Sequence, residues 1–250
     1  MAKQDTRDRF LSERTPILKA EIMRDKIVLI TGANGGLGTS ITKSFLAVCA
    51  SVTGVSNRIS AADFPQPNFT PISADLTKSS AANDVVQAVI ARHGRLDILV
   101  HVLGGFAGGK SVAETDDATW EQMRDLNLSS AFYVLRAAIP HLRKSGNGRI
   151  VAIGSLAANE PRAGIGAYIT FKSALVCLVR TVALENRDAG VTANVILPDT
   201  MDTPGNRKAM PNADPNKWVA TQDVAELALW LTDDRAAHTT GTVFPIAAKS

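Results

Sequence analysis

The sequence has little of what marks several specialised protein classes. It contains only two cysteines, Cys49 and Cys177, and both fall within apolar helical patterns. We therefore expect buried free thiols in a reducing compartment rather than a disulfide framework. No apolar run reaches membrane-spanning length, and residues 1–26 lack the apolar core of a signal peptide. These absences predict a cytoplasmic protein with no membrane partner.

Charge of one sign is also scarce. The formal net charge is +3, and the basic residues are dispersed along the chain. Proteins that bind nucleic acid usually concentrate positive charge on one face, so no nucleic-acid partner is expected. No metal site is predicted. The composition, 45% hydrophobic and 20% charged, is that of an ordinary globular protein.

Strand and helix patterns alternate through most of the chain. We expect strands near 27–31, 51–56, 69–73, 97–103, 148–154, 191–197 and 242–247. Helical patterns lie near 37–49, 79–93, 117–144, 166–189 and 221–233. This alternation indicates an α/β fold, a Rossmann-type doubly wound parallel sheet of about seven strands with helices on both faces. Such sheets bind ligands at the carboxyl ends of their strands.

One domain accounts for most of the length. Residues 26–250 are expected to form a single Rossmann-type domain, and residues 1–25 an N-terminal extension. The apolar residues of the extension fit two descriptions. They could form an amphipathic helix that packs on the body or on a partner subunit, or they could belong to a partly ordered tail.

A glycine-rich turn follows the first expected strand. In the stretch 26–38, an unbroken apolar run leads into glycines and then directly into a helical pattern. The N-terminus of a helix offers free N–H groups and a partial positive charge, which suit a phosphate or pyrophosphate. Gly32 permits the turn, Gly36 lets a ligand approach the backbone, and Gly38 allows close packing of helix on strand. The spacing is G-x-x-x-G-x-G and no G-K-[ST] follows, so a triphosphate P-loop is disfavoured.

The end of the second expected strand bears on the choice of cofactor. An NAD site usually has an acidic residue there to accept the ribose hydroxyls. No acidic residue occurs between Gly38 and Asp63, and the strand runs out into Ser56, Asn57 and Arg58. Arg58 could pair with a 2′-phosphate, so NADP is favoured over NAD.

Two later turns carry further candidates. Asp75 and Leu76 follow the third strand, where Asp75 could accept a hydrogen bond from an adenine amino group or cap the next helix. The fourth strand runs into Gly104-Gly105-Phe106-Ala107-Gly108-Gly109, and so many glycines predict a close approach to a bound ligand.

The acid–base candidates lie in the second half of the chain. Tyr168 and Lys172 are i and i+4 in a helical pattern, so their side chains share a face. A nearby ammonium favours the phenolate, and we expect it to lower the pKa of Tyr168 from its ordinary value of about 10. Ser155 follows the fifth strand, where its hydroxyl could hold a substrate oxygen. Asn127 lies inside a long helical pattern, a poor position for asparagine unless its amide has a role.

Taken together, these residues resemble the short-chain dehydrogenase/reductase family over about residues 24–247. The matching residues are the segment 31–38, Asp75, Asn127, Ser155, Tyr168, Lys172 and the segment 198–203. The resemblance implies hydride transfer to or from the nicotinamide, with Tyr168 as the proton donor or acceptor. It further implies that Lys172 binds the nicotinamide ribose, Ser155 orients the substrate, Asn127 holds a water linking Lys172 to solvent, and Thr203 contacts the carboxamide.

The expected sites can now be stated in full. The catalytic set is Asn127, Ser155, Tyr168 and Lys172. The cofactor set is Gly32, Asn34, Gly35, Gly36, Leu37, Gly38, Ser56, Asn57, Arg58, Asp75, Leu76, Gly104, Tyr168, Lys172, Pro198, Thr200 and Thr203.

The chain departs from the family pattern in two places. His101-Val102-Leu103-Gly104 stands where the family usually has Asn-Asn-Ala-Gly. His101 could be a second acid–base group or a satisfied structural histidine, and the second description is favoured. Pro198-Asp199 replaces the family's Pro-Gly, which stiffens the loop expected over the nicotinamide.

Two segments on the substrate side, 104–109 and 197–214 with Trp218, are similar to the quinonoid dihydropteridine reductases of the same superfamily. The likeness makes a flat, aromatic or quinone-like substrate possible. Phe106, Met210 and Trp218 would then be apolar substrate contacts, although Met210 and Trp218 could equally pack a lid helix.

Three functions are therefore weighed. The first is an NAD(P)-dependent reductase of a small carbonyl or quinone-like substrate, the second a dihydropteridine reductase-like pterin reductase, and the third a redox sensor that binds NAD(P) without turnover. The helical patterns 117–144 and 166–189 have more than one apolar stripe, which predicts packing against another subunit in a homodimer or homotetramer.

Overall fold

The structure is a computed structural model that describes residues 23–248. Seven parallel strands form one sheet in the order β3-β2-β1-β4-β5-β6-β7. The strands are β1 (Ile27–Thr31), β2 (Ser51–Ser56), β3 (Phe69–Ser73), β4 (Ile98–His101), β5 (Arg149–Ile153), β6 (Thr192–Pro198) and β7 (Val243–Ile246). The chain reverses direction across the sheet between β3 and β4, so the switch point lies beside β1, where ligands bind in such folds.

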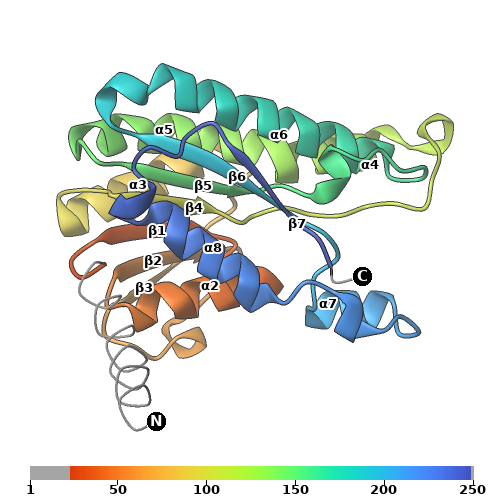
Figure 1. Cartoon of the computed structure of the whole chain (residues 1–250), viewed down its shortest axis with the longest axis horizontal. Coiled ribbons are helices and arrows are strands. Elements are labelled where there is room, and N and C mark those ends of the chain that lie inside the picture. The colour runs from red at the N-terminus through yellow and green to blue at the C-terminus, as the bar shows by residue number, and fades with distance from the viewer. Residues whose placement is uncertain (1–22, 249–250) are drawn as a thin grey trace, which may run out of the picture.

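Helices cover both faces of the sheet (Figure 1). They are α2 (Gly36–Ala47), α3 (Ser79–His93), α4 (Asp117–Arg124), α5 (Ser130–Lys144), α6 (Gly166–Glu185), α7 (Pro204–Ala209) and α8 (Thr221–Thr232). A π-helical turn, η3 (Asp125–Ser129), joins α4 to α5. The fold class expected from the sequence is confirmed.

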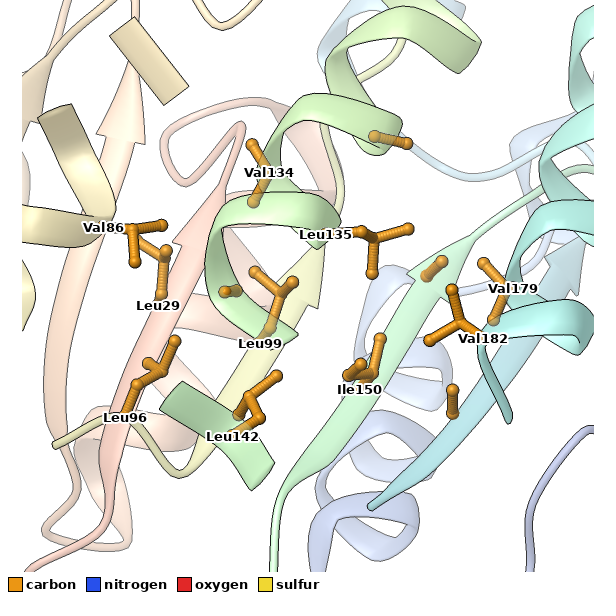
Figure 2. Packing of buried hydrophobic residues seen from close by; sticks show 14 of the residues in the cluster. Leu29, Val86, Leu96, Leu99, Val134, Leu135, Leu142, Ile150, Val179 and Val182 are labelled. Carbon is orange, nitrogen blue, oxygen red and sulfur yellow. The ribbon is translucent and has the colours of Figure 1, made fainter. Parts of the chain in front are cut away.

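The alternation of buried side chains along each strand builds two core layers. In β1, Leu29 packs into the layer under α3, α5 and α6. Figure 2 shows Leu29 next to Val86 and Leu99, with Val179 at the other side of the same layer. Val28 and Ile30 point to the opposite face, under α2 and α8. Because every residue of β1 is buried, the strand and the glycine turn after it are held firmly between the layers.

Three expectations about the chain need correction. Cys49 and Cys177 are exposed rather than buried. Cys49 lies past the last residue of α2 with φ +62°, and Cys177 lies on a side of α6 that faces away from the sheet. The expected helix 117–144 is interrupted by η3.

The third correction concerns the expectation that no apolar run reaches membrane-spanning length. The helix α6 has a length and hydropathy that would suit a membrane span. Its inner side packs Leu175, Val179 and Val182 into the core beneath, as the core helix of a globular protein does. The expected N-terminal extension lies mostly outside the described residues; Met23, near its end, is buried against the α2 layer.

Candidate active site

A cavity of about 1340 Å³ opens at the carboxyl ends of the strands. This volume exceeds that of a typical pocket for one drug-sized ligand, so it has room for a dinucleotide and a substrate together. Nineteen of the expected site residues line it: Gly32, Asn34, Gly35, Gly36, Leu37, Gly38, Ser56, Asn57, Arg58, Leu76, Gly104, Phe106, Ser155, Tyr168, Lys172, Pro198, Thr200, Thr203 and Met210. Asp75, Asn127 and Trp218 are not among the lining residues.

The glycine turn after β1 forms one wall of the cavity. Gly32 has φ +66°, a left-handed conformation that favours glycine. A Cβ at Gly38 would collide with the Gly32 carbonyl, and one at Gly36 would lie 2.9 Å from the Thr203 side chain. No side chain caps the N-terminus of α2 and no acidic residue lies in its first turn. The turn therefore presents free N–H groups and positive potential to the cavity, which fits the pyrophosphate of a dinucleotide.

The end of β2 forms the neighbouring wall. The Asn34 amide donates to the Arg58 carbonyl at 2.6 Å and so ties this segment to the glycine turn. The Arg58 side chain is exposed on the cavity wall, and no carboxylate of residues 23–248 forms a salt bridge with it. Asp63, the next acidic residue, accepts from the backbone and hydroxyl of Ser60. An unpaired guanidinium at this position suits a phosphate better than a ribose hydroxyl.

Asp75 has a local structural role in this structure. Its carboxylate accepts from the backbone N–H of Thr77 at 3.0 Å and from the Thr77 hydroxyl at 2.7 Å, which closes the turn before α3. These bonds lower the pKa of Asp75. The adjacent Leu76, rather than Asp75, lines the cavity.

Ser155, Tyr168 and Lys172 line the cavity close to one another: Ser155 is within hydrogen-bonding reach of Tyr168, and Lys172 Nζ lies 6.0 Å from the centre of the Tyr168 ring. Ser155 follows β5, and its hydroxyl accepts from the Ala157 N–H at 3.3 Å. Lys172 is buried on α6 and donates from Nζ to the Ile153 carbonyl at 3.0 Å. Burial lowers the pKa of Lys172 to about 8.

The expected effect of Lys172 on Tyr168 is not found. Burial raises the pKa of the Tyr168 phenol, and hydrogen bonding with Ser155 offsets only part of the rise. The Lys172 ammonium lies 6.0 Å from the centre of the Tyr168 ring. Burial decides the direction of the shift, so the tyrosine is a neutral phenol at physiological pH.

Asn127 supports the site from behind the cavity wall. It lies in the π-helical turn, a feature common near functional sites. Its amide donates to the carbonyls of Gly105 and Met123, each at 3.0 Å, and its Oδ1 accepts from the Gly105 N–H at 3.2 Å. Asn127 thus fixes the glycine loop that follows β4.

His101 fits neither of its two descriptions fully. It is buried, and burial together with the Lys172 charge lowers the pKa of the imidazole to about 3, so it stays neutral and is no acid–base group. Its Nδ1 lies 3.0 Å from the Thr31 hydroxyl. Its Nε2, however, has no hydrogen-bond partner in residues 23–248.

The substrate side is lined by apolar residues and one ion pair. The ring of Phe106 packs edge-on against Tyr168 with 5.1 Å between centroids, and 68% of Phe106 is exposed. Met210 lines the same side at the end of α7. Sequence reasoning missed Arg162 and Asp199, which also line the cavity and lie 3.9 Å apart. Their signal was weak, because Arg162 belongs to no motif, Asp199 stood out only as a departure from the family's Pro-Gly, and only the fold brings residues 162 and 199 together.

Comparison with known proteins matches this geometry. The family model for short chain dehydrogenases matches residues 26–214. The chain belongs to the short chain dehydrogenase family. It is therefore an NAD(P)-dependent oxidoreductase, as the resemblance implied.

Individual relatives agree over nearly the whole chain. A 2,5-dichloro-2,5-cyclohexadiene-1,4-diol dehydrogenase of Sphingobium indicum is 32% identical over 91% of this chain and 96% of its own length. A D-beta-hydroxybutyrate dehydrogenase of Rhizobium meliloti is 31% identical over 87% and 95%. The structure of a short-chain type dehydrogenase/reductase from Mycobacterium ulcerans superposes with a TM-score of 0.85 at 28% identity, covering 90% of this chain and 89% of that one.

Proposed function

We propose that the protein reduces a carbonyl or quinone-like group of a small molecule, with NADPH as the hydride donor and Tyr168 as the proton donor. The observation that supports this most directly is the proximity of Ser155, Tyr168 and Lys172 in a cavity that the glycine turn also lines. The bound nicotinamide would supply the hydride. The chain itself would orient the substrate oxygen and deliver the proton.

The protonation state of Tyr168 is the one that the proton donor of a reduction needs. The raised pKa keeps the phenol protonated at neutral pH, so its proton is available for the oxygen that gains charge when hydride arrives. Ser155 would hold the same oxygen from the neighbouring strand end. The Lys172 ammonium, directed by the Ile153 carbonyl, would place positive charge behind the phenol as the phenolate forms.

The preference for NADP rests on Arg58. Arg58 follows β2 and lies on the cavity wall beside the glycine turn. The nearby Asp63 carboxylate already accepts a hydrogen bond from the Ser60 N–H. A 2′-phosphate would be paired there, whereas an NAD ribose would find no free carboxylate to accept from its hydroxyls at the end of the strand.

The substrate side supports an apolar substrate. Phe106, which packs on Tyr168, and Met210 are exposed apolar residues of the cavity lining, which suits a flat ring or an alkyl chain beside the reacting carbonyl. A pterin reductase remains the second candidate because the Phe106 ring would also stack on a pterin ring. Trp218 is not among the lining residues. The sensor description is set aside, since the family is one of oxidoreductases.

The oligomeric part of the proposal rests on α4, α5 and α6. Trp120, Phe132 and Leu184 are 41%, 43% and 70% exposed on these helices, which lie along one side of the molecule in Figure 1. Only 39% of the apolar stretch of α6 is buried. A homodimer or homotetramer formed through this side would cover those residues. A cytoplasmic location stays a prediction from composition.

Oxidation of NADPH, followed by its absorbance with a panel of ketones, quinones and quinonoid dihydropterin, tests the proposal. Turnover of ketones or quinones that is lost in Tyr168→Phe supports it. Turnover restricted to the pterin would promote the second candidate. Binding of NADPH with no turnover of any compound in the reductive direction would contradict the proposed direction.

A further inference from the structure

We propose that His101 and Lys172 together hold one buried water molecule, and that His101 acts through this water as a positioning residue for the Lys172 ammonium. The proposal rests on the proposed function in so far as that ammonium is needed for reduction. The water site itself is a property of the free protein.

Both side chains lie on the same face of the sheet. His101 is two residues beyond Leu99, which packs under α5 in Figure 2, and strand alternation puts both on that face. In the register of the sheet, His101 lies between Thr31 of β1 and Ala152 of β5. Lys172 descends from α6 onto the next residue of β5, Ile153. The charge of the ammonium already acts on the imidazole.

The hydrogen-bond network assigns the tautomer of His101. The Thr31 hydroxyl oxygen accepts from the backbone N–H groups of Val102 at 3.1 Å and Leu103 at 3.2 Å. Its own proton is therefore left to donate to Nδ1, 3.0 Å away. Because the buried ring is neutral, its single N–H must be on Nε2. That N–H is a buried donor for which residues 23–248 provide no acceptor.

Lys172 also has donors to spare. An ammonium has three N–H groups, and the one hydrogen bond of Nζ within the described chain goes to the Ile153 carbonyl. The amide of Asn127 is already engaged with Gly105 and Met123. A Cβ at Gly104 would lie 3.0 Å from Nζ and 2.9 Å from Asn127 Oδ1, so the absence of a side chain there leaves this space open.

A water molecule satisfies both groups because its oxygen can accept two hydrogen bonds. One would come from His101 Nε2–H and one from Lys172 Nζ–H. Asn127 Oδ1 borders the same open space at Gly104 and, within residues 23–248, accepts only one hydrogen bond, from the Gly105 N–H, so it can accept a proton of the water in turn. An unpaired buried donor is costly, and this arrangement removes the cost for both.

The water matters because Lys172 titrates close to neutrality. The titratable groups that face it are Tyr168 on its own helix and the neutral His101 of β4, and no carboxylate of residues 23–248 forms a salt bridge with it. A water that accepts from the ammonium favours the charged form. Losing it would lower the pKa. A fall of about one unit, to the value of about 8 that burial alone gives, would cut the charged fraction at pH 8.5 about threefold.

Two nearly isosteric variants separate the donor from the shape of the side chain. His101→Met and His101→Gln both lose the ring and its contact with Thr31, but only glutamine keeps an N–H donor near the position of Nε2. We expect His101→Met to lower the pKa of Lys172 by about one unit and to move the alkaline limb of the NADPH oxidation rate down equally. His101→Gln should stay within about 0.3 unit of the parent.

The pKa of Lys172 is measured by NMR in the free protein labelled with ¹³C-lysine, with the signal assigned by its loss in Lys172→Gln. Thr53→Val, which removes another buried hydroxyl without a partner, controls for general effects of a core substitution. Equal shifts in the Met and Gln variants, or none in either, would overturn the proposal.

The parent protein provides a test that needs no variant to fold. In ¹⁵N-histidine NMR, His101 should be the neutral Nε2–H tautomer from pH 5 to 9, with a magnetisation transfer to bound water. The Nδ1–H tautomer, or no contact with water, would refute the proposal. If these results hold while no substrate is reduced, the proposed function fails and the water site stands. If a substrate is reduced but the pKa of Lys172 does not shift as expected in the His101 variants, the proposed function stands and the water site fails.

Discussion

Replacing Arg58 with alanine should weaken NADPH binding about tenfold and leave NADH binding almost unchanged. The two cofactors differ only in the 2′-phosphate, and Arg58 is the exposed cation on the cavity wall at the end of β2. Its guanidinium forms no salt bridge within residues 23–248, so its removal breaks no internal ion pair. The change therefore acts on the ligand rather than on the fold.

The magnitude follows from the type of contact. A hydrogen bond between a guanidinium and a phosphate contributes about 1.5–3 kcal/mol, which corresponds to about 10- to 150-fold in affinity. Because Arg58 is exposed, water and salt screen the pair, and the lower end of that range applies. Arg58→Glu adds repulsion of the phosphate and should exceed the effect of alanine.

The assay is a paired fluorescence titration with NADPH and NADH at low and at physiological salt. Arg92→Ala, which removes an exposed arginine at the far end of α3, controls for the loss of one positive charge. The NADPH penalty should shrink as salt rises. Equal losses for the two cofactors, or a loss equal to that of Arg92→Ala, would refute the assignment of Arg58 to the 2′-phosphate.

Three further outcomes are expected. Tyr168→Phe should abolish turnover and keep cofactor affinity within about twofold, because it removes only the proton; substantial residual rate in single turnovers would contradict its role. The His101 pKa of about 3 lies below its ordinary value, so the unfolded chain binds the proton first, and stability is lost as the pH falls below 6.5. Between pH 6.5 and 5 the parent should lose about 1.5 kcal/mol more than His101→Gln in urea unfolding, and parallel curves would refute burial of a neutral imidazole. Leu184→Glu should shift the protein towards the monomer in sedimentation, and an unchanged mass would move the interface away from α6.

The sheet could be predicted because its strands carry a strong local signal. The strands β1, β4, β5 and β6 contain short apolar runs, and the alternation of strands with helices leaves few topologies. The glycine turn was equally predictable. The positive φ at Gly32 and the close packing at Gly38 require glycine, and the sequence has glycine at both positions.

The segments after β6 were harder to read. The short helix α7 begins at Pro204. Its N-cap is Thr203, whose hydroxyl accepts a hydrogen bond from the Asn206 N–H, and only the structure shows this cap. The likeness to the quinonoid dihydropteridine reductases predicted Trp218 as a substrate contact, but Trp218 does not line the cavity. Loop residues are positioned by contacts remote in sequence, so their type alone does not tell which side they face.

The tyrosine illustrates a limit of a different kind. Spacing places Tyr168 and Lys172 on one helical face, and the structure agrees, but it reverses the expected direction of the pKa shift. Proximity in sequence fixes the sign of the charge–charge effect, whereas the desolvation of both groups depends on how deeply the fold buries them. The same burial that lowers the pKa of Lys172 raises that of Tyr168. A neutral phenol beside a buried ammonium is the arrangement that the proposed reduction needs, and a single water on Lys172 would have leverage over its rate.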